Sequence, residues 1–77
     1  MLHIHLDKLY IKLNDKSCKK FLQFIDHLKR DNIDIQFAKT IYGDYNEDTV
    51  PVIVSNEIKY IGFNQSVLYI ESMIRDI

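Results

Sequence analysis

The sequence contains few of the residues that small, chemically active domains rely on. Its 77 residues include one cysteine, one proline, two glycines and no tryptophan. Because Cys18 is the only thiol, an internal disulfide and a cysteine-rich zinc site are both excluded. A secreted scaffold held together by disulfides is excluded for the same reason.

A strong charge and a long apolar run are also missing. The formal net charge is -1, so the chain lacks the field that steers a protein to nucleic acid or to an anionic membrane. No apolar run approaches the length of a membrane span, and Met1 opens a strand-like segment rather than a basic, signal-like one. We therefore expect a cytoplasmic protein that binds neither nucleic acid nor a membrane.

The chain does contain enough apolar residues for one core. Hydrophobic residues make up 47% of it, an ordinary fraction for a globular protein. Its length leaves room for a single domain over residues 1–77. A domain this small needs efficient packing, or packing shared with a protein partner or a second copy in a homodimer.

The N-terminal segment alternates between apolar and polar residues, which predicts a strand. Leu2, Ile4 and Leu6 set the first apolar parity, and residues 9–13 read as a strand buried on both faces. The parity shifts between Leu6 and Leu9. Either a bulge near residues 7–8 or a separate extra strand within residues 1–8 would explain the shift.

The rest of the chain predicts two helices and three further strands. A helix capped by Asn14 or Asp15 carries apolar residues at helical spacing from Cys18 to Leu28. Strands follow at residues 33–37, 51–54 and 58–61, residues 40–48 read mostly as loop, and Asn64 caps a last helix. The order is β-α-β-β-β-α, an α/β fold with one four-stranded mixed sheet and helices packed on it.

Three short segments resemble, in order, the motifs of the glutaredoxin family and its ribonucleotide-reductase-donor relatives. Residues 12–19 (KLNDKSCK) match the start of the first helix, where the family has Cys-x-x-Cys. Thr49-Val50-Pro51 resembles the family's turn with a cis proline. Residues 60–66 (YIGFNQS), with Gly62, are similar to the turn before its last helix.

The resemblance implies a thioredoxin-like fold of the glutaredoxin type, with two departures. Asp15 stands where the family has its first, attacking cysteine, and Cys18 stands at the second position. The family also places a helix between the second strand and Thr-Val-Pro. Residues 40–48 leave room for about one helical turn, so that second helix is expected to be shortened or missing.

The resemblance also assigns roles to individual residues. Lys12 and the pair Asn64 and Gln65 match positions that bind the two ends of glutathione, so glutathione is the cofactor that the family implies. Val50, next to Pro51, would offer its backbone N–H and C=O to an extended peptide or to glutathione. Read from the sequence alone, Lys12 is a solvated strand-end lysine, and Asn64 and Gln65 are capping residues.

No metal site is expected. His3 and His5 lie on one strand face without a third ligand. Residues 44–55 imitate a calcium loop, but Thr49 stands where glycine is needed and Ser55 where the bidentate glutamate belongs. The lysines near the first helix read as a solvated face.

These residues are compatible with three alternative functions. The first is a glutaredoxin-like domain with a degenerate active site, a non-catalytic module that binds a protein through the groove at Pro51 or through its sheet face. The second is a thiol–disulfide oxidoreductase or glutathione-dependent electron donor that works through Cys18 alone. A nucleic-acid module with Tyr10, Phe37 and Tyr60 as stacking platforms is disfavoured by the balanced charge.

Overall fold

The computed structural model describes residues 1–43 and 49–76 and contains the predicted order of elements. In chain order these are β1 (Leu2–Ile11), α1 (Lys16–Arg30), β2 (Ile33–Tyr42), β3 (Val52–Ser55), β4 (Ile58–Ile61) and α2 (Gly62–Arg75). The β-α-β-β-β-α prediction is confirmed. In the described part of the chain, no helix is both long and apolar enough to cross a membrane.

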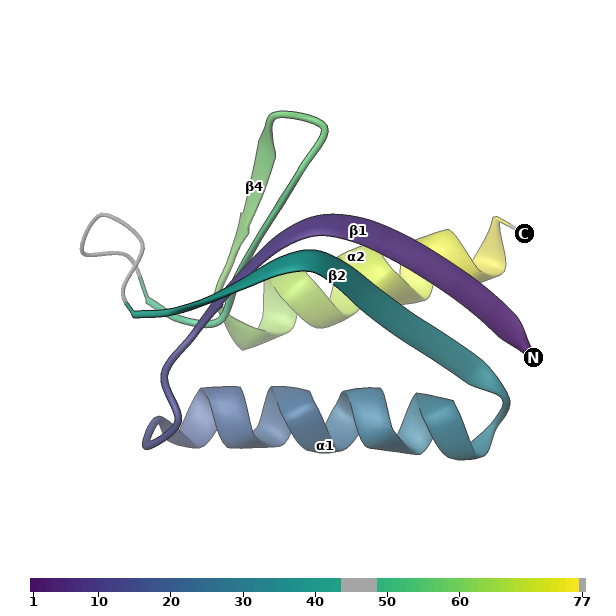
Figure 1. Cartoon of the computed structure of the whole chain (residues 1–77), viewed down its shortest axis with the longest axis horizontal. Coiled ribbons are helices and arrows are strands. Elements are labelled where there is room, and N and C mark those ends of the chain that lie inside the picture. The colour runs from purple at the N-terminus through teal and green to yellow at the C-terminus, as the bar shows by residue number, and fades with distance from the viewer. Residues whose placement is uncertain (44–48, 77) are drawn as a thin grey trace.

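The four strands form one mixed sheet in the order β2-β1-β3-β4. β1 runs parallel to β2, as a strand-helix-strand unit of this length predicts, and antiparallel to β3. β3 and β4 form the predicted hairpin, whose two turn residues, Asn56 and Glu57, both have positive φ. The two helices contact each other, so both lie on one side of the sheet, and α1 runs beneath the arch of β1 and β2 (Figure 1).

The N-terminal segment is a single strand, so the separate extra strand within residues 1–8 is wrong. A bulge relative to β2 is wrong too, because the register keeps one offset from the pair Leu2 and Ile33 to the pair Ile11 and Tyr42. Leu6 and Leu9 are nevertheless both buried. The parity change falls at Asp7, which is missing from the residues that pair with β2. β1 and β2 curve together along their length (Figure 1).

The prediction of loop for residues 40–48 is wrong at its beginning. β2 continues through Tyr42, because pairing with β1 satisfies the main chain of these polar residues. Residues 40–43 contain no helix. The remainder of that prediction, and the shortened or missing second helix, fall on residues 44–48 and lie outside the described residues.

The last helix begins three residues earlier than predicted, and Asn64 does not cap it. Ile61 is the N-cap residue and has no side-chain capping bond. Instead, Gln65 Oε1 accepts a hydrogen bond from Ile61 N–H at 3.0 Å. Gly62, with φ at 88°, occupies a conformation that glycine adopts readily. The start of α2 is therefore set by this glycine and by Gln65.

The core lies between the sheet and the two helices. Its most deeply buried members come from every part of the chain and include Phe21 of α1, Ile53 of β3 and Ile70 of α2, each with no exposed surface. Val50 and Cys18 belong to the same cluster. The segments that carry the family resemblance are thus joined to one core.

Candidate functional site

The first part of the site is the tight turn that leads from β1 into α1. Asp15 is the N-cap residue of α1, one of the two predicted capping residues, and its Oδ1 accepts a hydrogen bond from Cys18 N–H at 3.0 Å. Asp15 N–H donates to the carbonyl oxygen of Lys12 at 3.2 Å, which closes the turn. The carboxylate at the motif's first position is thus occupied in stabilising the helix.

Cys18 lies under this turn and has 1% of its surface exposed. Its Sγ accepts a hydrogen bond from Lys12 N–H at 3.3 Å. Burial is the main cause that raises the pKa of the Cys18 thiol; the Lys12 N–H opposes it, and the charge of Asp15 adds to it. A buried thiol with a raised pKa is a poor nucleophile.

The second part of the site is the segment before β3. The peptide bond between Val50 and Pro51 is cis, as the family resemblance predicts. Both side chains are buried, and the carbonyl oxygen of Pro51 accepts a hydrogen bond from Gly62 N–H at 2.8 Å. Within the described residues, the main chain of Thr49 and Val50 forms no hydrogen bond.

The third part is the first turn of α2. Asn64 and Gln65 are both exposed, and the side-chain oxygen of Gln65 is taken up by Ile61 N–H. The capping interpretation therefore holds for Gln65 and not for Asn64. Ser66, which follows, is fully buried, and its Oγ donates to the carbonyl oxygen of Tyr60 at 3.4 Å. The bond from Gly62 to Pro51 ties this turn to the start of β3.

The structure joins the predicted site residues in two groups. Lys12, Asp15 and Cys18 share one hydrogen-bonded turn, and Pro51 and Gly62 are linked directly. The exposed Lys12 also lines an open cavity of about 340 Å³, together with Leu13, Asn14, Tyr42 and Gly43. Sequence reasoning missed Leu13 and Tyr42. No local signal could have found them, because they come together only through the pairing of β1 with β2.

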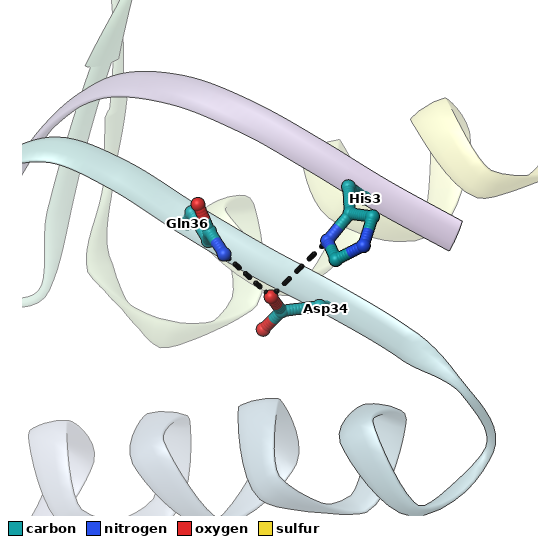
Figure 2. A network of polar contacts seen from close by, with 3 residues as sticks. All are labelled: His3, Asp34 and Gln36. Carbon is teal, nitrogen blue, oxygen red and sulfur yellow. Dashed lines mark hydrogen bonds and ion pairs between the residues drawn. The ribbon is translucent and has the colours of Figure 1, made fainter. Parts of the chain in front are cut away.

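His3 and His5 lie on one strand, with ring centroids 6.4 Å apart. His3 and Asp34 are neighbours across β1 and β2, with His3 Nδ1 3.4 Å from Asp34 Oδ2 (Figure 2). Gln36 Nε2 donates to the same oxygen at 2.6 Å, and this bond is the main cause that lowers the pKa of Asp34. Among residues 1–43 and 49–76 no group of side chains suits a metal ion. The calcium-loop positions 44–48 lie outside the described residues.

Two of the three aromatic residues considered as a stacking platform, Phe37 and Tyr60, pack against residues of the helices. Phe37 packs against Phe21 of α1, with ring centroids 6.5 Å apart. Tyr60 stacks on Tyr69 of α2 at 3.8 Å. Both rings therefore face the helices, and only a sheet face open to solvent could stack nucleic-acid bases.

No protein family, curated protein or solved structure matches this chain.

Proposed function

We propose that this chain is a cytoplasmic glutaredoxin-like domain with a degenerate active site, which binds a protein and does not catalyse thiol–disulfide exchange. The mixed sheet with its β-α-β-β-β-α order is the arrangement that the resemblance implies. The hydrogen bond between Gly62 and Pro51, which links two of the three motif segments, supports it further.

The observation that carries the proposal is which side chains occupy the two motif positions and how these side chains are held. Exchange needs a thiolate that is both accessible and stabilised. The first position holds the Asp15 carboxylate, which accepts a hydrogen bond from Cys18 N–H and cannot attack a disulfide. The second position holds a thiol that is buried and whose pKa is raised. Neither position supplies an attacking sulfur.

The binding surface in this proposal is the rim of the former active site. The unbonded main chain at Thr49 and Val50 can pair with an extended segment of a partner, since main-chain hydrogen bonds give affinity in that mode of recognition. The exposed turn at residues 12–14 lies at the start of α1. In this proposal a protein partner occupies the place of glutathione.

The competing function is an oxidoreductase that works through Cys18. It is favoured by the Lys12 N–H, which lowers the pKa of the thiol. Burial acts in the opposite direction and is the larger effect. For this function to hold, the native thiol would have to react with a disulfide in spite of its 1% exposure.

Two measurements on the whole chain separate these functions. We expect iodoacetamide at neutral pH to alkylate Cys18 more slowly than free cysteine, and at the rate of free cysteine once urea unfolds the chain. We also expect immobilised protein to capture a partner under reducing conditions, and a Cys18→Ala variant to capture it equally. Reduction of a mixed disulfide that Cys18→Ala abolishes would overturn the proposal.

The surface is tested at Thr49 rather than at Val50. A Val50→Arg substitution would place a charge in the core, because Val50 is buried, and would test folding instead. Thr49 is exposed and stands beside the same main chain. Thr49→Arg is expected to weaken capture of the partner, whereas Thr49→Ser, its matched control, is expected to leave capture unchanged.

A further inference from the structure

We draw no further inference here: the strongest candidate, the open cavity that the exposed side chains of Leu13 and Tyr42 line at the turn into α1, lies beside charged residues of both signs, and nothing in the structure shows what covers it.

Discussion

Removing the carboxylate of Asp15 tests directly whether this side chain stabilises the start of α1. In the folded chain this carboxylate accepts the N–H of Cys18, which would otherwise be an unpaired donor at the start of α1. Asp15→Ala removes the acceptor, and substitution of an N-cap aspartate by alanine costs about 0.5–2 kcal/mol. With a middle value of about 1 kcal/mol, the ratio of folded to unfolded chains falls about fivefold.

The same loss of free energy predicts a change in the melting temperature. For a domain of about 60–100 residues, about 1 kcal/mol lowers Tm by roughly 4–8 °C. Asp15→Asn keeps a side-chain oxygen at the same position, so it should lose only the interaction of the charge with the helix dipole, about 0.3–1 kcal/mol. The expected order of stability is wild type, then Asp15→Asn, then Asp15→Ala.

Urea denaturation followed by circular dichroism measures these differences, and amide hydrogen exchange at Cys18 gives a local readout. Asn14→Ala is the matched control, because Asn14 is exposed and its side chain forms no hydrogen bond within the described residues. The reasoning is refuted if Asp15→Ala is as stable as Asn14→Ala, or if the amide of Cys18 keeps its protection in Asp15→Ala.

Two further predictions concern the sheet. Gln36→Ala removes the main cause that lowers the pKa of Asp34, so that pKa should rise towards its ordinary value in an NMR titration of the carboxyl carbon; an unchanged midpoint would contradict this. Because the folded pKa is the lower one, the wild type should lose stability relative to Gln36→Ala as the pH falls below about 4. Glu57→Gly should raise the free energy of unfolding by about 0.5–1 kcal/mol, because Glu57 has φ at 67° in the hairpin turn and glycine adopts that conformation without a steric penalty. Urea midpoints measure the gain, and a loss of stability would show that the Glu57 side chain stabilises the hairpin.

Most of the fold could be predicted because its signals are local. Alternation gave β1 and the beginning of β2, and the spacing of apolar residues after Asp15 gave α1 with its cap. The end of β2 could not be predicted in this way. Thr40 and Tyr42 are in a strand because they pair with Leu9 and Ile11, and such pairing leaves no mark on local composition.

In the candidate site too, contacts within one segment of the chain could be predicted, whereas contacts between segments could not. Asp15 and Cys18 could be placed together from sequence, because their spacing is that of one helical turn. The link from Pro51 to Gly62 could not be predicted, because it follows from the register of β3 with β4, in which Val52 pairs with Ile61. The cavity that Leu13 and Tyr42 share could not be found from sequence, since these residues come together only through the register of Ile11 with Tyr42.

The two motif positions and the proposed binding surface have separate physical roles. Asp15 and Cys18 are held by hydrogen bonds within the turn, so their substitution acts on stability. Thr49 and Leu13 are exposed, and their side chains leave the turn intact when they are changed. Under the proposed function, Asp15 stabilises α1 at the first motif position while the exposed rim is available for recognition. Variants of the first group should therefore unfold more easily and still bind their partner when folded, whereas variants of the second group should fold normally and bind less.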